Sequence, residues 1–270
     1  MVTFPRAKIN IGLTIVRKRD DGFHDIETIF YPIPLADALE FVPAGPGAVS
    51  DTLTVTGVAD LGNPADNLVI KAVNILRTRY PVPYLRIHLH KTIPPGSGLG
   101  GGSSDASAML VLLNRYFGLQ ASQEELLTLA LQLGSDCPFF IRPEPVLATG
   151  RGEIFTPLGC LLTGYYLVLV RDDIHISTPM AYAGSKPRGS EAGLAGLVTA
   201  PVEEWKDRVV NDFEEYAFRQ YPRLSMLKQG MYDAGAIYSS MSGSGSAIYG
   251  IFTSRPNTPP PGNIIWQGEL

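Results

Sequence analysis

The stretch "PPGSGLGGGSSDAS", residues 94–107, places five glycines and four serines in fourteen positions. This composition occurs in flexible linkers and also in loops whose backbone approaches a ligand closely. An alternating strand pattern, "YLRIHLHK", precedes the stretch, and an amphipathic helical pattern, "DASAMLVLLNRYFGL", follows it. Because no domain boundary lies on either side, this context argues against a linker.

A dinucleotide-binding loop is a second interpretation, since Gly96, Gly98 and Gly101 fit the pattern G-x-G-x-x-G. The preceding strand, however, alternates between polar and apolar residues, whereas the strand before a dinucleotide loop is buried on both faces. Pro94 and Pro95 also interrupt the junction between strand and loop. Both features disfavour this interpretation.

A phosphate cradle is the interpretation that fits best. Ser103, Ser104 and Asp105 open the following helix, and a helix N-terminus offers unpaired N–H groups and the positive end of the helix dipole. No lysine follows the glycines, so this is not the loop G-x-x-x-x-G-K-[ST]. The positive charge must come from elsewhere, and Lys91, Lys8 or Mg²⁺ could supply it.

The rest of the chain alternates strand and helix patterns. Strands are predicted over 7–18, 26–35, 51–57, 84–91, 138–141, 145–158, 164–173 and 236–252, and helices over 66–80, 105–119, 122–134 and 203–220. The Pro-rich tail at 253–263 is predicted to be loop. The mixture predicts an α+β fold, not a doubly wound parallel sheet.

The composition is that of a globular protein: 45% of the 270 residues are hydrophobic and 18% are charged. The formal net charge of −4 and the pI near 5.6 argue against a general nucleic-acid binder. Two cysteines cannot build a disulfide framework. Neither a signal-peptide pattern nor an apolar run long enough to span a membrane is present, so we expect a cytoplasmic enzyme.

Asp136, in "LGSDCPFF", follows a helix stop and is a candidate to orient or deprotonate an acceptor hydroxyl. A turn aspartate that caps its own backbone is the alternative. Lys8 on the first strand could keep that carboxylate ionised if the two groups are close, although a strand lysine usually faces solvent. Phe23 and His24, beside a turn, suit stacking and hydrogen bonding to a base.

A second loop of small residues, "SGSGS" at 242–246, leads into an apolar strand. A tight turn between two strands would explain it, but such a turn needs fewer glycines. These motifs together resemble those of the GHMP small-molecule kinases, in the same order along the chain: a lysine on the first strand, "PPGSGLGGGSSDAS", "GSDCPFF" and "MSGSGSAIYGIF".

The resemblance implies a two-domain architecture. An N-terminal ATP-binding domain of the ribosomal-protein-S5-like type would span residues 1–155, and a C-terminal ferredoxin-like α/β-plait domain would span 156–270. "AKINIGLTIVRKRDDGFHDIETIF" is similar to the members of the family that phosphorylate the 2-hydroxyl of a cytidine diphosphate methylerythritol. Those members serve the non-mevalonate route to isoprenoid precursors. A homoserine or mevalonate kinase, or a non-catalytic nucleotide-binding regulator, is the alternative.

The resemblance also implies the roles of individual residues. Asp136 matches the catalytic aspartate and Lys8 its charged partner. The implied ATP-binding residues are Asn67, Leu68, Lys91, Pro94, Gly96, Gly98, Leu99, Gly100, Gly101, Gly102, Ser103 and Ser104. The implied substrate-binding residues are Asn10, Phe23, His24, Asp136, Thr178 and Tyr182. Ser104 is the candidate ligand of Mg²⁺. The expected partners are ATP and the small-molecule substrate, with no nucleic acid or membrane, in a monomer or weak homodimer.

Overall fold

The computed structural model describes residues 1–58, 66–189 and 193–270, which form two compact units. The first unit comprises residues 1–7, 33–95 and 100–143, and the second comprises 8–32, 96–99 and 144–270. Each unit is therefore assembled from segments that are distant in the sequence. The predicted boundary between residues 155 and 156 stays a prediction.

The first unit contains a four-stranded sheet in the order β1-β4-β6-β5. Its strands are β1 (Val2–Thr3), β4 (Ala38–Pro43), β5 (Thr52–Gly57) and β6 (Leu85–Lys91). Strand β4 pairs antiparallel with β6, and β5 pairs parallel with β6. The parallel pair is connected through helix α1, as the geometry of parallel strands requires.

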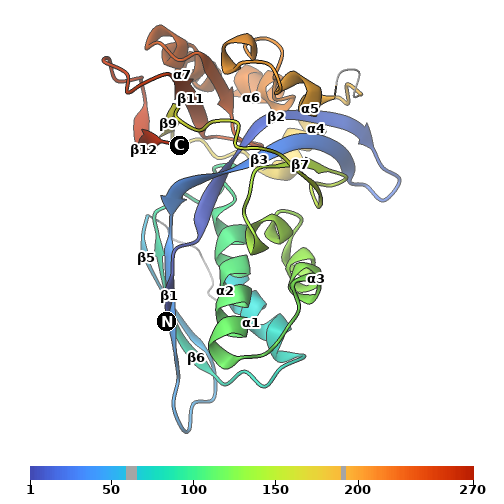
Figure 1. The fold of residues 1–270 in the computed structure, drawn as a ribbon, viewed down its shortest axis with the longest axis vertical. Helices are drawn as coiled ribbons and strands as arrows, with labels where there is room; N and C mark the ends of the chain where they lie inside the picture. Colours follow the sequence, from blue (N-terminus) through green and yellow to red (C-terminus); the bar gives the residue numbers. More distant parts are fainter. Residues whose placement is uncertain (59–65, 190–192) are drawn as a thin grey trace. The chain divides into compact units, whose positions relative to one another are not determined.

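The helices of the first unit are α1 (Leu68–Arg77), α2 (Gly101–Phe117) and α3 (Gln123–Leu133), which pack on one another (Figure 1). One face of the sheet, with Leu39, Phe41, Ile87 and Leu89, shares a core with buried residues of α1 and α2. The ends of these helices carry residue types that favour caps: Asn67 and Ser122 accept hydrogen bonds from the first turns of α1 and α3, and Gly118 ends α2 in the left-handed conformation.

The second unit contains two four-stranded sheets (Figure 1). One has the order β2-β3-β7-β8 and consists of β2 (Arg6–Lys18), β3 (His24–Ala36), β7 (Val146–Thr149) and β8 (Ile154–Pro157). The other has the order β10-β11-β9-β12 and consists of β9 (Tyr166–Arg171), β10 (Tyr238–Met241), β11 (Ile248–Phe252) and β12 (Asn263–Glu269). The α+β class is thus confirmed.

The helices of the second unit are α4 (Thr178–Gly184), α5 (Leu194–Leu197), α6 (Phe213–Gln220) and α7 (Pro222–Asp233), with the 3₁₀ turn η3 (Val202–Glu204). A buried core joins Leu13 and Ile15 of β2 to Val168 of β9, Phe213 of α6 and Leu227 of α7. None of the helices in the described ranges is both long and apolar enough to cross a bilayer.

Two local predictions were wrong. Residues 138–141 lie not in a strand but in the 3₁₀ helix η2 (Cys137–Ile141), which belongs to the first unit and has Pro138 in its first turn. The helix predicted over 203–220 is divided into η3 and α6, and Asp207 between them has a φ of 66° that no helix tolerates. The predicted loop of the tail is confirmed as far as residue 262, after which β12, a strand that was not predicted, pairs with β9.

Candidate active site

The glycine-rich stretch contributes to both units, because Gly96–Leu99 belongs to the second and Gly100 onward to the first. Helix α2 begins at Gly101, earlier than predicted, so its first four residues are the two glycines and two serines at 101–104 of the glycine-rich stretch. The site residues are therefore described within each unit separately.

In the first unit, Gly100 precedes α2 in the left-handed conformation, with a φ of 72°. The first intrahelical bond of this end runs from the N–H of Ser104 to the carbonyl of Gly100, at 2.9 Å. A Cβ on Gly101 would lie 2.8 Å from Cγ2 of Ile93, so glycine is required for this close packing. The N–H groups of the first turn have no partner within a helix, and they can bind phosphate oxygens.

A buried ionic cluster, consisting of Asp37, Lys91 and Asp105, underlies this helix start. The Lys91 ammonium donates to Asp37 and, at 2.7 Å, to Oδ2 of Asp105. Asp37 also accepts hydrogen bonds from the N–H groups of Thr92 and Ile93. Burial and the nearby charge of Asp37 raise the pKa of Asp105 to about 7, against the opposing effect of Lys91. The cluster fixes the end of β6 against the first turns of α2.

Ser104 is buried, and its hydroxyl donates to the carbonyl of Arg6 at 2.7 Å. The oxygen of this hydroxyl keeps lone pairs that can coordinate a cation. Oxygen ligands suit Mg²⁺, which in phosphoryl-transfer sites takes only one or two ligands from the protein and the rest from phosphate and water. Ser104 therefore fits the predicted role by its chemistry. Among the described residues, no cluster of three or more histidine, cysteine and carboxylate side chains could hold a metal ion.

The other predicted residues of the first unit lie at helix starts. Asn67 caps α1, its Oδ1 accepting from the N–H of Val69 at 2.9 Å, and Leu68 is the first residue of α1. A Cβ on Gly102 would contact Leu68 at 3.7 Å, so the starts of α1 and α2 are neighbours. Pro94 is buried.

Asp136 precedes η2 and is partly exposed. Its side chain makes no capping hydrogen bond to that helix, in the part of the chain that is described. The Asp136 carboxylate therefore does not cap η2. Asp136 is the residue directly before η2, and its neighbour Cys137, the first residue of η2, is buried.

In the second unit, the segment Gly96–Leu99 packs on the loop of residues 242–246. The carbonyl of Gly98 accepts from the Ser242 hydroxyl and from the Lys8 ammonium, each at 2.9 Å. A Cβ on Gly98 would lie only 1.9 Å from the carbonyl oxygen of Ser242, and the φ of Gly98 is 79°. The loop predicted as a second small-residue motif thus has a function beyond turning the chain: it holds the glycine-rich segment.

Lys8 is buried on β2, contrary to the usual position of a strand lysine. Its ammonium donates to Oδ1 of Asn10 as well as to Gly98, and it lies 5.0 Å from the centre of the Phe30 ring. Asn10 donates to the Thr28 hydroxyl at 2.9 Å, and its own N–H binds Ser242 at 3.1 Å. Lys8 and Asn10 therefore lie together, and the Lys8 ammonium contacts the glycine-rich segment of the second unit.

His24 and Tyr182 stack with their ring centres 4.5 Å apart, and the Phe213 ring contacts Tyr182 edge-on at 4.9 Å. Burial, with a smaller contribution from Lys18, lowers the pKa of His24, so the imidazole is neutral at pH 7. The hydroxyl of Thr178 lies 3.3 Å from that of Ser244. Helix α4, which begins at Thr178, thus connects the aromatic pair to the 242–246 loop.

Phe23 has about half of its surface exposed, at 51%, and the Arg151 guanidinium lies 4.8 Å from its ring centre. Nε of Arg151 lies 3.5 Å from Oε1 of Glu153, and Oε2 of Glu153 accepts a hydrogen bond from the backbone N–H of Arg151. The Arg151 guanidinium and the half-exposed Phe23 ring thus form a cation–π pair, in which the positive charge is attracted to the face of the ring.

Sequence reasoning missed Asp37, Thr28 and Ser242 as members of these clusters. Ser242 could have been found, because it opens the second glycine-serine loop. Asp37 and Thr28 carry no local signal, since the partners of their side chains lie at least 54 and 16 residues away, respectively.

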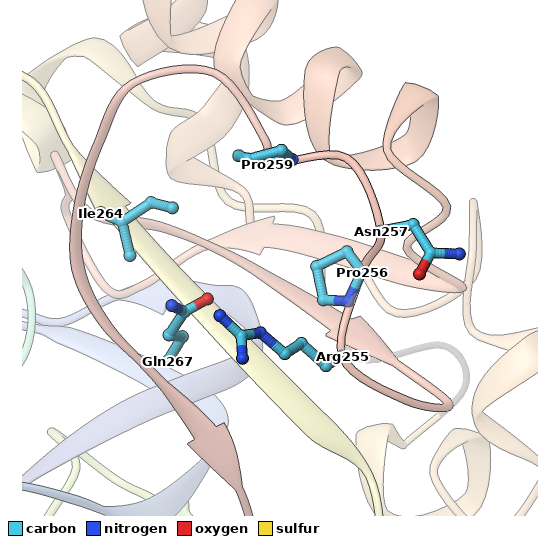
Figure 2. Close-up of a pocket in the computed structure, with 6 residues that line it drawn as sticks. All are labelled: Arg255, Pro256, Asn257, Pro259, Ile264 and Gln267. Atoms are coloured by element: carbon cyan, nitrogen blue, oxygen red, sulfur yellow. The ribbon is translucent and has the colours of Figure 1, made fainter.

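A pocket of about 410 Å³ lies elsewhere in the second unit, where the tail turns back into β12 (Figure 2). Its lining residues are Arg255, Pro256, Asn257, Pro259, Ile264 and Gln267. None of the predicted site residues is among them.

Two family models match the chain: "GHMP kinases N terminal domain" over residues 67–143 and "GHMP kinases C terminal" over residues 202–258. The first covers the glycine-rich helix start and Asp136, and the second covers the loop of residues 242–246. Fold and site together define a kinase of the GHMP class.

The relatives are more specific. A protein of Parabacteroides distasonis named 4-diphosphocytidyl-2-C-methyl-D-erythritol kinase is 47% identical over 274 residues and 100% of both chains. One of the same name from Azobacteroides pseudotrichonymphae is 51% identical over 96% of both. A crystal structure of 4-(cytidine 5'-diphospho)-2C-methyl-D-erythritol kinase is 32% identical, with a TM-score of 0.76 over 93% of this chain and 90% of that one. The chain belongs to this family of GHMP kinases.

A homoserine kinase from Cytophaga hutchinsonii has a TM-score of 0.65 over 93% of this chain and 86% of that one, at 18% identity. At that identity the similarity concerns the fold alone.

Proposed function

We propose that the enzyme transfers the γ-phosphoryl group of ATP to the 2-hydroxyl of 4-diphosphocytidyl-2-C-methyl-D-erythritol. The observation that carries the proposal is the 47% identity to a kinase of this name over the whole of both chains. The aromatic pair of His24 and Tyr182 supports it, because a neutral histidine beside a ring offers stacking and a hydrogen bond to a pyrimidine base.

Within this proposal, the phosphates of ATP bind the glycine-rich residues Gly96, Gly98, Leu99 and Gly100–Ser104. Asn67, Leu68, Lys91 and Pro94 contribute to the same nucleotide. Support comes from the helix start at Gly101, whose N–H groups are available for phosphate oxygens. Mg²⁺, when bound, neutralises charge on the phosphoryl oxygens, and Ser104 would be its ligand from the protein.

Asp136 accepts or orients the proton of the attacking hydroxyl. A tertiary alcohol is crowded, so positioning contributes more than activation of the nucleophile. Lys8 supplies a positive charge that keeps an acid ionised and lowers the proton affinity of the hydroxyl. The burial of the Lys8 ammonium supports this role, because a charge in a low-dielectric environment interacts more strongly with a nearby carboxylate than an exposed charge does.

Asn10, Phe23, His24, Thr178 and Tyr182 bind the substrate in this proposal. The cytosine ring stacks near the aromatic pair and the exposed face of Phe23. In these relatives' pathway the product is an isoprenoid precursor, and we propose that the enzyme works in the cytoplasm as a monomer or weak homodimer. The negative net charge supports a small-molecule partner and not a nucleic acid.

ADP release tests the proposal directly. The purified enzyme is assayed with Mg²⁺ and ATP and with the cytidine diphosphate compound, homoserine or mevalonate as acceptor. We expect turnover with the cytidine compound alone. Turnover with homoserine or mevalonate instead would contradict the proposed acceptor, and ATP binding without turnover of any acceptor would favour a non-catalytic regulator.

A further inference from the structure

His175 lies directly against the glycine-rich segment of the second unit. A Cβ placed on Gly96 would be 2.7 Å from Nδ1 and 2.8 Å from Cε1 of the His175 ring. Gly96 itself has a φ of 61°, which also favours glycine. The missing side chain at Gly96 therefore makes room for an imidazole, and not only for a ligand.

The position of His175 is set by its neighbours in the chain. The carbonyl of Ile174 accepts a hydrogen bond from the Ser246 hydroxyl, and the buried Ile176 packs near Gly245. Ser177 then caps α4, its hydroxyl accepting from the N–H of Met180. The backbone on both sides of His175 is thus anchored, to the 242–246 loop and to the start of α4.

The imidazole ring of His175 is nevertheless available for a hydrogen bond to a ligand. Its side chain is exposed, and among the described residues it makes no hydrogen bond or ion pair. An exposed imidazole that is fixed by its backbone but has no polar partner in the protein can donate to a ligand without first breaking a bond. Pre-positioned donors of this kind lose little entropy on binding.

The chemistry of the surroundings indicates what the ligand is. The adjacent segment consists of glycines, a serine and a leucine, and hydroxyls of the 242–246 loop contact Gly98 and Ile174. Neither the segment nor the loop contains a cationic side chain, and the ammonium of Lys8, which contacts the segment, binds the carbonyl of Gly98. A nitrogen donor at the entrance of the segment complements phosphoryl oxygens, the acceptors that such loops bind.

We propose that His175 is a phosphate ligand, donating a hydrogen bond from its imidazole to a phosphoryl oxygen of a nucleotide bound at Gly96. The inference rests on the proposed kinase function and adds a residue to that site. Two phosphorylated groups share the required chemistry, the triphosphate of ATP and the diphosphate of the cytidine compound.

Steady-state kinetics of His175→Ala and His175→Gln test the proposal. ATP is varied at saturating acceptor, and the acceptor at saturating ATP. In His175→Ala we expect one KM to rise about fivefold, the factor for one lost hydrogen bond, with kcat changed less than twofold. The substrate whose KM rises identifies the phosphate group. His175→Gln retains an N–H donor and is expected to recover at least half of the loss.

The matched control is His88, which lies on β6 and hydrogen-bonds to Thr56 and Glu40. His88→Ala and His88→Gln should leave both KM values unchanged. Unchanged KM values in His175→Ala, or an equal fall of kcat in the alanine and glutamine variants with constant KM, would overturn the proposal.

A measurement on the unmodified enzyme covers the case that the variants do not fold. The four histidines allow the ring resonances to be resolved by NMR, and the His175 resonance should shift when a non-hydrolysable ATP analogue or CDP is added. No shift with either compound contradicts the proposal. Because binding is measured without turnover, this result is independent of whether the proposed acceptor is correct.

Discussion

Lys8 and Asp136 are the two residues for which local sequence offered an ordinary explanation. A strand lysine usually faces water and a turn aspartate usually caps its own backbone. Lys8 is instead 3% exposed and donates to Asn10 and Gly98, and Asp136 makes no cap bond to η2. Lys8 therefore departs from the usual position of a strand lysine, and Asp136 from that of an aspartate that caps the helix it precedes.

Asp136→Asn should lower kcat by about two orders of magnitude or more, because the amide cannot accept the proton of the hydroxyl. The KM for ATP should change little, since the proposed phosphate contacts are elsewhere. The measurement is ADP release at saturating substrates, with Asp233→Asn, an exposed aspartate on α7, as control. A kcat close to that of the unmodified enzyme would remove Asp136 from the chemistry.

At the scale of elements, the glycine-rich stretch owes its conformation to two different contacts. Gly101 is required by Ile93, within the first unit, and Gly98 by the carbonyl of Ser242, within the second. The sequence reveals that side chains were excluded there, but not which neighbour excludes them.

Gly98→Ala tests this packing. The added Cβ would meet the Ser242 carbonyl, and alanine is strained at a φ of 79°. We expect the free energy of unfolding to fall by about 2–5 kcal/mol, as the sum of the backbone strain and overpacking. Urea denaturation measures it. Gly164→Ala is the control, because Gly164 has a similar φ of 84° and no atom within 4 Å of its Cβ position. Equal losses in the two variants would show that packing against Ser242 contributes nothing.

The ionic cluster beneath α2 predicts a pH dependence. The pKa of Asp105 is raised in the folded chain, chiefly by burial, to about 7. The folded state therefore binds the proton more tightly than the unfolded state, and the stability that this proton confers is lost as the pH rises from about 4 through 7. Asp105→Asn cannot lose a proton, so its free energy of unfolding should improve relative to that of the unmodified protein between pH 5 and pH 8.

Urea denaturation at pH 5.0, 6.5 and 8.0, without nucleotide, measures this difference. Asp233→Asn, which removes an exposed carboxylate, should show no such trend. A constant difference between Asp105→Asn and the unmodified protein across the range would mean that Asp105 keeps its charge in the fold.

At the scale of the whole molecule, neither compact unit is one continuous piece of chain. Leu13 and Ile15 on β2 belong to the same buried core as Val168 and Phe213. The N–H of Leu13 bonds to the carbonyl of Val210 at 2.9 Å, and that of Ile15 to Asp212 at 2.8 Å. A cut near residue 157 would break these contacts and expose the apolar face of β9.

Separate expression of residues 1–157 and 158–270 tests this dependence. We expect the second fragment to lose cooperative thermal unfolding, because its core lacks β2. Circular dichroism of each fragment, and of the two mixed, measures it, with the intact chain as control. A sharp transition for residues 158–270 alone would show that a boundary near 155 separates independently stable domains.

The sequence by itself determined the class of fold and the residue types that cap α1, α2 and α3, and it predicts that residues 94–107 bind phosphate. These features depend on residue types at short spacing: glycine where backbone must be bare, and asparagine or serine where a helix begins. Family resemblance added the candidate roles of Asp136, Lys8 and the aromatic residues, which periodicity alone could not supply.

Only the tertiary structure decided that Lys8 is buried, that Ser242 holds Gly98 across 144 positions of sequence, and that Asp37 completes an ionic cluster with Lys91. It likewise showed β12 beside β9, where the proline-rich tail had indicated only loop. The physical reason is the same in each case. Burial and long-range hydrogen bonds depend on which distant segments of the chain pack together in the core, and local residue patterns do not predict which segments these are.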